Sequence, residues 1–517
     1  MDKQDCRRFQ YTHRITIVLI SFGSLWRIVS YIFSANSGGD AGTHVALAAD
    51  WLQHPTLRFT FAGYPPGHFW LIALFTLVIQ NVTVAARLLS LVLGIASLVF
   101  FWKLARLLYG VSAGLLSLAI FSLYTLHIGY STTSSSEVPF LFFVLVGAYY
   151  LFAGVHDQAA QLGKLAFSGA CFSVAECIRY EAWILFAGFF AVLAVLEGKD
   201  RWPQTRQWLK PVVSFGLAGG AWPVFMMLYS WHAFGDPMHL VTMNRWRVTS
   251  YLAEHPVSRG YQLALMPSAI LLSLSPLAVI GAMYGLARSF TARFAASLAS
   301  VTIFFCAVEC YEVYTGGLLA TARYTLTLGT MLALISGYGL ELGLNGLFRS
   351  RIALARAVVI TLVLLNSLIV LAGSELPNPY SEKLASVSPR LRYQKRIQVV
   401  ADYLRKHLGP NDAVVIDDYN VESNVIADAA GLPIFRGNRA YLLSRTNTIP
   451  VDEYVRTEHP RFLVYATGGR LEHLITLSKD STVADVNGVQ FRCVFKSDIY
   501  RIYQLTYGLT SFRYPES

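Results

Sequence analysis

Apolar runs long enough to cross a lipid bilayer recur from Arg14 to Gly373, and they restrict this chain more than any other feature. A helix needs about 20 predominantly apolar residues to cross roughly 30 Å of hydrocarbon. Backbone polar groups inside lipid must bond within their own segment, so such runs form helices. The sequence therefore predicts a polytopic α-helical membrane protein. Its 54% hydrophobic and 14% charged residues and its mean hydropathy of +0.46 agree with this fold class.

The runs predict about eleven spans. The first follows Arg7, Arg8 and Arg14 but is longer than the apolar region of a signal peptide, so we expect it to be retained. The expected spans are Ile15–Phe33, Val84–Trp102, Ala113–Gly129, Val138–Gly154, Leu165–Ile178, Ala182–Leu196, Pro211–Trp231, Gln262–Ala287, Ala295–Cys310, Tyr324–Leu344 and Leu354–Ala372.

A further apolar run, Phe69–Ile79, decides the topology. If it crossed the membrane, the gap that holds Lys103 and Arg106 would lie outside, against the bias of basic residues toward cytoplasmic loops. If it lies at the interface or re-enters, every strongly basic gap falls inside. We expect the second arrangement, in a cell inner (plasma) membrane, with the N-terminus cytoplasmic and the C-terminal part periplasmic or extracellular.

The apolar runs stop after Glu375, and the remaining residues have ordinary globular composition. We expect a transmembrane module over 1–376, with outer loops at 34–83, 130–137 and 232–261, and a small outer-face α/β domain over 377–517. Helices are expected at 393–407, 421–430 and 451–458, and strands at 413–416, 433–435, 462–466, 489–495 and 500–505. Asp417 and Asp418, at a strand end, are expected in a solvated turn.

Ionisable residues near the span ends gather in the outer half of this topology. They are Arg27, Glu176, Arg179, Glu181, Glu309, Glu312 and Arg323. A charge at membrane depth costs about 2.5–3.5 kcal/mol on insertion scales, so such residues usually face a bundle interior or a wet cavity. A polar cavity that opens outward is the economical explanation. The alternative is that each charge reaches the headgroups separately.

Asp40 follows the first span where helix-like apolar spacing begins, so it can serve as an N-cap. The stretch continues as Ala48-Ala49-Asp50-Trp51-Leu52 and Gly63-Tyr64-Pro65-Pro66-Gly67-His68-Phe69-Trp70-Leu71. It resembles the first outer loop of GT-C glycosyltransferases that use lipid-linked sugars, in particular the protein mannosyltransferase and lipid A aminoarabinose transferase group. Asp40 matches the catalytic aspartate of that group, whereas Ala41 replaces its second acidic residue.

Three later segments extend the resemblance. Glu137, after the serine and threonine run 131–136, stands where the group places an acidic residue before its fourth span, although it can also be a helix-capping glutamate. The segment 175–183, which contains Arg179 and Glu181, is similar to the short-helix junction of the group. Arg323-Tyr324 resembles its late Arg-Tyr motif. The resemblance covers roughly the first 375 residues, in order.

The resemblance implies an inverting glycosyltransferase that moves a sugar, a hexose or a pentose, from a polyprenyl phosphate donor to an outer-face lipid, glycan or protein acceptor. Asp40 and Glu137 are then the expected catalytic residues, because a carboxylate acting as general base contributes about 10²–10⁴-fold. Arginine can hold the departing phosphate through two hydrogen bonds. The expected substrate-binding residues are Arg179, Glu181, Arg323, Tyr324, His44, Tyr64 and His68. Arg245 and Arg247 in the loop 232–260 could close over the site or be solvated.

No cofactor and no nucleic-acid partner are expected. Asp40, His44, His68 and Glu137 share the outer side and are ligand types for divalent metals, but no spacing motif supports a metal site. Two other functions stay open. A transporter or flippase of lipid-linked sugars would show internal repeats and broken span pairs, which the sequence lacks. A non-catalytic scaffold for envelope assembly would tolerate loss of Asp40.

Overall fold

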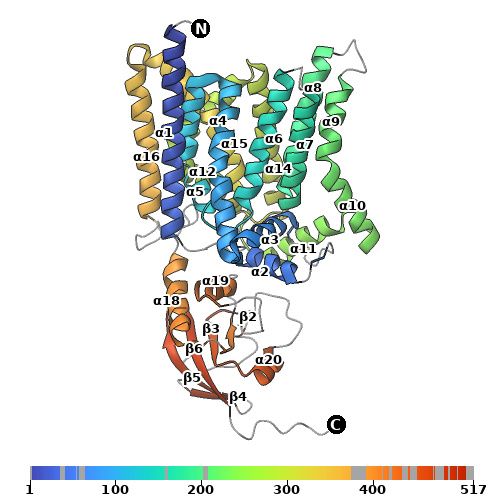
Figure 1. The fold of residues 1–517 in the computed structure, drawn as a ribbon, viewed down its shortest axis with the longest axis vertical. Coiled ribbons are helices and arrows are strands. Elements are labelled where there is room, and N and C mark those ends of the chain that lie inside the picture. The colour runs from blue at the N-terminus through green and yellow to red at the C-terminus, as the bar shows by residue number, and fades with distance from the viewer. Residues whose placement is uncertain are drawn as a thin grey trace.

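The computed structural model describes residues 3–34, 41–53, 55–56, 64–157, 161–201, 208–254, 256–373, 392–409, 411–417, 422–432, 440–442, 451–469, 471, 483–486, 489–497 and 499–507. A helical bundle forms the N-terminal part, and a mixed sheet with three helices lies at one end of it, opposite the N-terminus (Figure 1). The expected fold class, a polytopic helical bundle followed by a small α/β region, is confirmed. The expected domain boundary at 376–377 lies outside the described residues.

The bundle contains helices of very different length. They are α1 (Lys3–Phe33), α2 (Ala41–Gln53), α3 (Gly67–Ile79), α4 (Val82–Ser122), α5 (Thr125–Tyr130), α6 (Glu137–His156), α7 (Gln161–Ile178), α8 (Glu181–Arg201), α9 (Leu209–Gly219), α10 (Ala221–Phe234), α11 (His239–Glu254), α12 (Arg259–Leu274), α13 (Pro276–Ser289), α14 (Arg293–Thr315), the 3₁₀ turn η2 (Ala322–Tyr324), α15 (Thr325–Leu347), the 3₁₀ turn η3 (Arg349–Arg351) and α16 (Ile352–Gly373).

Seven of the described helices are long and apolar enough to cross a membrane, or up to nine when each of two bent pairs is one span. Each expected span coincides with a helix, with one part of α4 or with a bent pair. The 41 residues of α4 contain the expected span Val84–Trp102 and the first part of Ala113–Gly129, which continues into α5. Gly110 interrupts α4 with φ 82° and ψ −179°. Glycine tolerates this left-handed φ because it has no Cβ, so α4 folds back as two arms.

The sequence was expected to lack broken span pairs, and that expectation is wrong, because α9 and α10 meet at 48° and α12 and α13 meet at 109°. The second pair begins beside η2 and ends beside the far part of α15. At its start, the Gln262 side chain accepts a hydrogen bond from the Ala320 N–H, just before η2 and α15. Near its end, Gly285 packs against Gly339, far along α15. A Cβ on Gly339 would come within 2.4 Å of the Gly285 nitrogen, so only glycine permits this approach.

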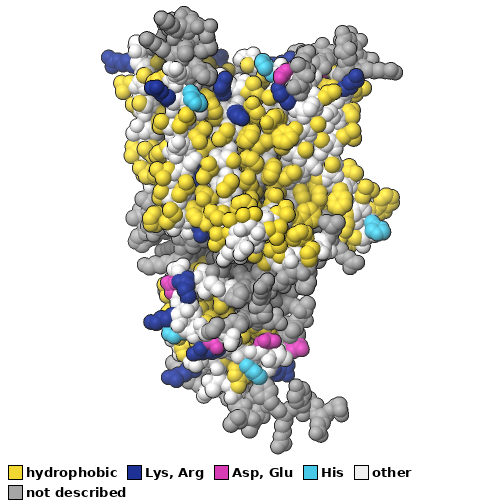
Figure 2. Space-filling view, in the orientation of Figure 1, with side chains coloured by type: hydrophobic (Ala, Val, Ile, Leu, Met, Phe, Trp, Pro, Cys, Tyr) yellow, Lys and Arg dark blue, Asp and Glu magenta, His cyan; other side chains and the backbone are white. Residues whose placement is uncertain are grey.

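Short helices cover the end of the bundle that faces the sheet domain. α3 has 13 residues, about 20 Å at 1.5 Å per residue, which is too short to cross roughly 30 Å of hydrocarbon. It lies with α2 and α11 at this end (Figure 1). The segment 232–260, expected as an outer loop, contains α11, whose 16 residues form more than four helical turns. On the face shown in Figure 2, a belt of apolar side chains covers the bundle between a rim of Lys and Arg at the N-terminal end and the sheet domain.

The sheet domain has six described strands in the order β2-β1-β3-β6-β5-β4. β2, β1 and β3 are parallel, and the other pairs are antiparallel. The elements are α18 (Arg392–His407), β1 (Val414–Ile416), α19 (Glu422–Ala429), β2 (Ala440–Leu442), α20 (Val451–Glu458), β3 (Phe462–Ala466), β4 (Val483–Val486), β5 (Val489–Lys496) and β6 (Tyr500–Tyr507). α19 contacts α2 of the bundle.

Two expectations for this domain need comment. The strand expected at 433–435 lies outside the described residues, and β2 follows it instead. Asp417 does not lie in a solvated turn: it is fully buried and accepts hydrogen bonds from the N–H groups of Ala466 and Leu471. The expectation is wrong because the carboxylate satisfies backbone donors after β3, which apolar spacing in the sequence does not reveal. Asp418 lies outside the described residues.

Candidate active site

Three separate segments bring charged side chains together at the end of the bundle that bears α2 and α3. Glu137 begins α6, where the positive end of the helix dipole favours an acidic residue. Arg179 lies in the short break between α7 and α8, and Glu181 begins α8. Arg323 and Tyr324 form η2, just before α15. The five residues are far apart in the sequence but were all expected in one site.

Arg179 is the centre of this cluster. Its Nη1 donates to Glu137 Oε1 at 2.8 Å, and its Nη2 and Nε donate to Glu181 Oε1 at 2.5 and 3.0 Å. The side chains of Arg179 and Glu137 are only 11% and 4% exposed. Burial lowers the pKa of Arg179, but the two carboxylates outweigh burial and raise it above its ordinary value. Arg179 is thus a permanent cation, and it compensates part of the charge of the two carboxylates.

Arg323 stands at the edge of the same cluster. Its Nη1 is 4.0 Å from Glu137 Oε1, and its side chain is 26% exposed. Its Nη2 donates to the Tyr324 hydroxyl at 3.1 Å. The guanidinium groups of Arg323 and Arg179 lie 4.9 and 5.7 Å from the centre of the Tyr324 ring. Two cations therefore share one aromatic ring and one carboxylate, and Arg323 is the more accessible of them.

A group of aromatic side chains adjoins the cluster. The His44 ring, on α2, lies 4.8 Å from the Tyr64 ring and 4.5 Å from the His68 ring, measured between centroids. A Cβ on Gly67 would lie 2.7 Å from the Cys177 carbonyl oxygen, so glycine lets α3 begin directly against the end of α7. Burial, then His44 and Arg179, lower the pKa of His68 well below its ordinary value. The fully buried imidazole of His68 is therefore neutral beside the cluster.

Asp40, the expected catalytic aspartate, lies outside the described residues. The structure describes its neighbour Ala41, the first residue of α2, which is fully buried. The Ala41 carbonyl accepts a hydrogen bond from Ser134 Oγ at 2.9 Å. Ser134 belongs to the buried polar turn 131–136, which leads directly into Glu137. Within the described chain, the start of α2 is thus fixed next to the turn that carries Glu137.

Two residues join the cluster that the site prediction did not include. Ser136 accepts a hydrogen bond from Arg179 Nη1 at 3.0 Å. Its position directly before Glu137 is the sequence feature from which its place in the cluster could have been predicted. Glu309 in α14 is 2% exposed, and neither of its oxygens has a hydrogen-bond partner among the described residues. It interacts electrostatically with Glu181 and Arg179. The signal for Glu309 was a glutamate inside an apolar span.

Other expected participants lie elsewhere. Arg245, on α11, is 3.7 Å from Glu312 and donates to Thr315 Oγ1 at 3.0 Å, so it is tied to the end of α14. Arg27 is held by α4 and α5 rather than by a carboxylate. Among the described residues, no group of three or more His, Cys, Asp or Glu side chains could hold a metal ion.

Comparisons with known proteins agree with this arrangement. Residues 64–227 match the family model described as dolichyl-phosphate-mannose-protein mannosyltransferase. The structure is similar to ArnT from Cupriavidus metallidurans bound to undecaprenyl phosphate, with a TM-score of 0.63 at 13% identity over 94% of this chain and 97% of that one. The expected resemblance is confirmed. Its apo structure gives a TM-score of 0.61 at 14% identity over the same shares of the two chains.

A second protein shares this fold more distantly. The archaeal oligosaccharyltransferase AglB from Archaeoglobus fulgidus, in complex with an inhibitory peptide and a dolichol-phosphate, matches with a TM-score of 0.51 at 10% identity, over 89% of this chain and 70% of that one. A comparison with curated proteins finds no match. The family match includes Tyr64, His68, Glu137, Arg179 and Glu181 but ends before Arg323 and Tyr324. The chain is a multi-pass membrane protein with an ArnT-like fold.

Proposed function

We propose that this chain is an inverting glycosyltransferase that moves a hexosyl or pentosyl group from a polyprenyl phosphate donor to a lipid, glycan or protein acceptor. One observation carries the proposal: a buried Glu137–Arg179–Glu181 cluster, with Arg323 at its more exposed edge, lies in an ArnT-like fold at one membrane face. The ArnT structure binds undecaprenyl phosphate, and AglB binds dolichol-phosphate; both are polyprenyl-type phosphates.

The reaction requires one bond to form as another breaks. The acceptor oxygen attacks the anomeric carbon, and the bond from that carbon to the phosphate oxygen breaks, so the configuration inverts. The polyprenyl phosphate leaves as an anion and needs no proton. The acceptor must lose its proton, and in this proposal the Asp40 carboxylate takes it.

The arginines differ in the roles that their surroundings permit. Arg323 is less buried and can donate to the departing phosphate, which stabilises the negative charge that develops on it. Arg179 is already held by two carboxylates, so it orients Glu137 and Glu181 and adds positive potential at the site. In this proposal Glu137 and Glu181 bind sugar hydroxyls, Tyr324 packs against the sugar, and Tyr64, His44 and neutral His68 bind the acceptor.

The membrane orientation belongs to the same proposal. The rim of Lys and Arg at the N-terminal end of the bundle fits a cytoplasmic face (Figure 2). The cluster, the short helices and the sheet domain share the opposite end (Figure 1). We therefore place the transfer reaction at the outer face of the inner membrane, with the boundary of the outer domain near residue 377.

Transfer assays with the purified full-length protein in vesicles test this proposal. A panel of radiolabelled polyprenyl phosphate sugars would be offered with membrane extracts as acceptor source, and product and stereochemistry would be measured. Asp40→Asn should lower transfer at least roughly 100-fold, because it removes the proposed general base. Glu137→Gln should also lower transfer, because it removes a carboxylate that binds the sugar and pairs with Arg179. Asp236→Asn is the matched control, because Asp236 is an exposed carboxylate outside the cluster. Full transfer by Asp40→Asn would refute the base assignment, and lipid movement without transfer would indicate a flippase.

A further inference from the structure

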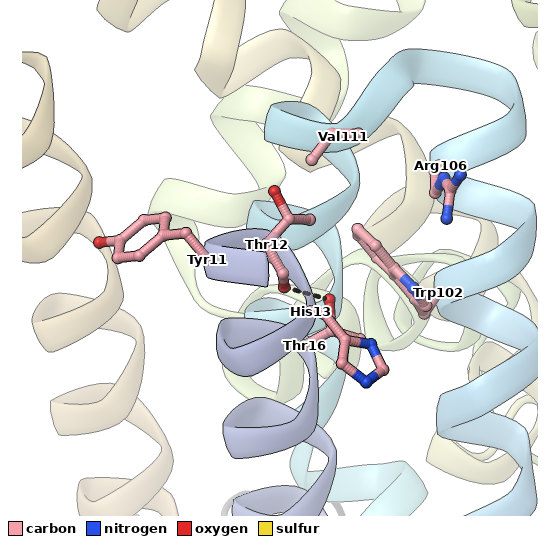
Figure 3. A pocket seen from close by; sticks show the side chains of 7 residues that line it. All are labelled: Tyr11, Thr12, His13, Thr16, Trp102, Arg106 and Val111. Atoms are coloured by element: carbon pink, nitrogen blue, oxygen red, sulfur yellow. Dashed lines mark hydrogen bonds between the residues drawn. The ribbon is translucent and has the colours of Figure 1, made fainter. Parts of the chain in front are cut away.

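A groove of about 440 Å³ lies at the N-terminal end of the bundle, at the opposite end from the charged cluster (Figure 3). It is bounded by α1 and by the two arms of α4, which meet at Gly110. Thr12, His13 and Thr16 line it from α1, and Trp102, Arg106 and Val111 line it from α4. The site proposed for transfer uses none of these residues.

The groove combines a free cation with an apolar floor. Arg106 is exposed, and within the described part of the chain its guanidinium has no hydrogen bond or ion pair. Trp102 and Thr16 are each 7% exposed and form the floor. The Thr16 hydroxyl donates to the Thr12 carbonyl at 3.0 Å, as the dashed line in Figure 3 marks, so it is already satisfied. No acidic residue among those described lines the groove.

The groove opens onto the surface that faces lipid. On α1, Ile17 and Val18 directly follow the lining residues, and they are 50% and 65% exposed. Val111, on the other wall, is 40% exposed. The groove therefore joins the apolar belt just below the basic rim of the bundle (Figure 2). A ligand that fills it needs an anionic group at the rim and an apolar chain below.

We propose that this groove binds an anionic phospholipid from the leaflet at the N-terminal end of α1. Its phosphate lies against the Arg106 guanidinium, which matches phosphate geometry with two hydrogen bonds. One acyl chain runs between Trp102 and the exposed face of α1. Basic pockets between membrane helices bind anionic headgroups in this way, and the apolar floor favours a lipid over free phosphate. The proposal does not depend on the proposed transfer activity.

Native mass spectrometry of the delipidated full-length protein in detergent tests this site. Phosphatidylglycerol, phosphatidylcholine and glycerol phosphate would each be titrated. We expect phosphatidylglycerol to bind most tightly, and Arg106→Gln to weaken it roughly fivefold. Phosphatidylcholine should be weakened less, because its choline cation offsets the charge of its phosphate. Lys210→Gln is the matched control, because Lys210 is an exposed cation near the start of α9 that does not line the groove.

A second variant tests the apolar part of the groove. Val111→Trp fills the wall without changing charge, and we expect it to weaken both phospholipids. Equal binding of phosphatidylglycerol and phosphatidylcholine to the unmodified protein would overturn the proposal. So would equal losses in Arg106→Gln and Lys210→Gln, or glycerol phosphate binding as tightly as phosphatidylglycerol. Unchanged lipid binding by Val111→Trp would place the lipid elsewhere.

Discussion

Two arginines buried in the helical bundle have opposite surroundings. Arg27 in α1 is fully buried, and its hydrogen-bond partners among the described residues are neutral: Nη1 donates to the Gly23 carbonyl at 2.9 Å, and Nη2 lies 2.8 Å from Nδ1 of His127. Arg179 contacts the carboxylates of Glu137 and Glu181 at 2.8 and 2.5 Å. The first arginine joins helices, whereas the second belongs to a group of charges.

This difference predicts where a ligand can bind. The carbonyls of Phe121 and Ser122 also lie 3.4 Å from the Arg27 guanidinium, so this cation is surrounded by α4 and α5 and fastens α1 to them. The surroundings of Arg179 are different. Glu137 lies near both Arg179 and Arg323, and a quarter of the Arg323 side chain is exposed. A ligand group can therefore reach the cluster and replace an internal partner of a carboxylate. A buried charge is therefore evidence for a site only when its partners are charged too.

The largest effect is expected from Arg179→Gln. The change leaves the buried carboxylates of Glu137 and Glu181 without their shared cation, and breaking a buried pair in this way costs about 3–5 kcal/mol. Transfer should fall about 10²–10³-fold, as for loss of a donor near the developing charge. Thermal unfolding and transfer rate of the purified variant check both effects.

Two further variants separate structure from chemistry at Arg179. The double variant Arg179→Gln with Glu137→Gln should regain part of the lost stability, because one unpaired charge is gone, but no transfer. Arg245→Gln is the control: its contact with Glu312 spans 3.7 Å between side chains that are 48% and 31% exposed, so about 0–1 kcal/mol is at stake. If Arg179→Gln behaved like Arg245→Gln, the contrast between buried arginines would fail.

Arg27→Met should destabilise the protein without impairing catalysis. It removes hydrogen bonds of a charged donor, each worth about 1.5–3 kcal/mol, and some of this loss is regained because no charge remains buried. We expect a lower unfolding temperature and an unchanged transfer rate per folded molecule. Arg14→Gln, on the exposed face of the same helix, should change neither. A stable but inactive Arg27→Met would show that neutral partners also build active sites.

The sequence indicated that Arg27 and Arg179 both lie in the outer half of the membrane, but it could not show that their partners differ. Apolar runs and loop charges predicted the spans, the short segment that became α3, and the end of the bundle at which the charged residues lie. These features depend on bilayer thickness and on the composition of the loops. The partners depend on tertiary packing. His127, which contacts Arg27, is an isolated histidine in an apolar run, and no spacing rule connects it to a residue 100 positions away.

The residues of the candidate site were predicted from the order of their motifs along the chain and from the membrane side expected for each, not from distances between side chains. Five predicted residues meet in the cluster, whereas Asp40 lies outside the described part of the chain. Glu309 was seen as an outer-half charge but not as a neighbour of Arg179, because only packing brings α14 beside the break between α7 and α8. In the sheet domain, Asp417 shows the same limit: its burial follows from the position of β3, not from its own neighbours in sequence.

Arg323→Lys tests the accessible edge of the cluster. Lysine keeps the charge but cannot donate through a planar fork, so one charge-assisted hydrogen bond to phosphate is lost, about 1.5 kcal/mol or roughly tenfold. We expect kcat/KM for the lipid-linked donor to fall about tenfold, mainly through kcat, because the lost hydrogen bond stabilises the developing charge. The unfolding temperature should not change, because Glu137 keeps Arg179 as its partner. An effect on stability equal to that of Arg179→Gln would mean that both arginines are structural.

The smallest effect on stability is expected from an arginine whose ion pair is exposed to solvent. Arg461 Nη1 lies 2.6 Å from Asp412 Oδ2 in the sheet domain, where the two side chains are 45% and 26% exposed. Burial raises the pKa of Asp412, but the Gly409 N–H and the Arg461 guanidinium together outweigh burial and lower it below its ordinary value of 3.8. The stabilisation is therefore complete above that value and is lost as the pH falls through the lower, folded-state pKa.

Exposure to solvent keeps this contribution small, at about 0.2–1 kcal/mol. Amide hydrogen exchange of β1 and β3 in the full-length protein, corrected for intrinsic rates, would be followed from about pH 5 down to pH 3. Near pH 5, the amides of β1 and β3 in Asp412→Asn should be less protected from exchange than in the unmodified protein, and this protection should depend less on pH. Asp402→Asn, which removes an exposed pair with Arg405 within one helix, is the control. If Asp412→Asn cost as much as Arg27→Met, burial would not be what separates these arginines, because an exposed pair in water would then stabilise as strongly as a cation enclosed among helices.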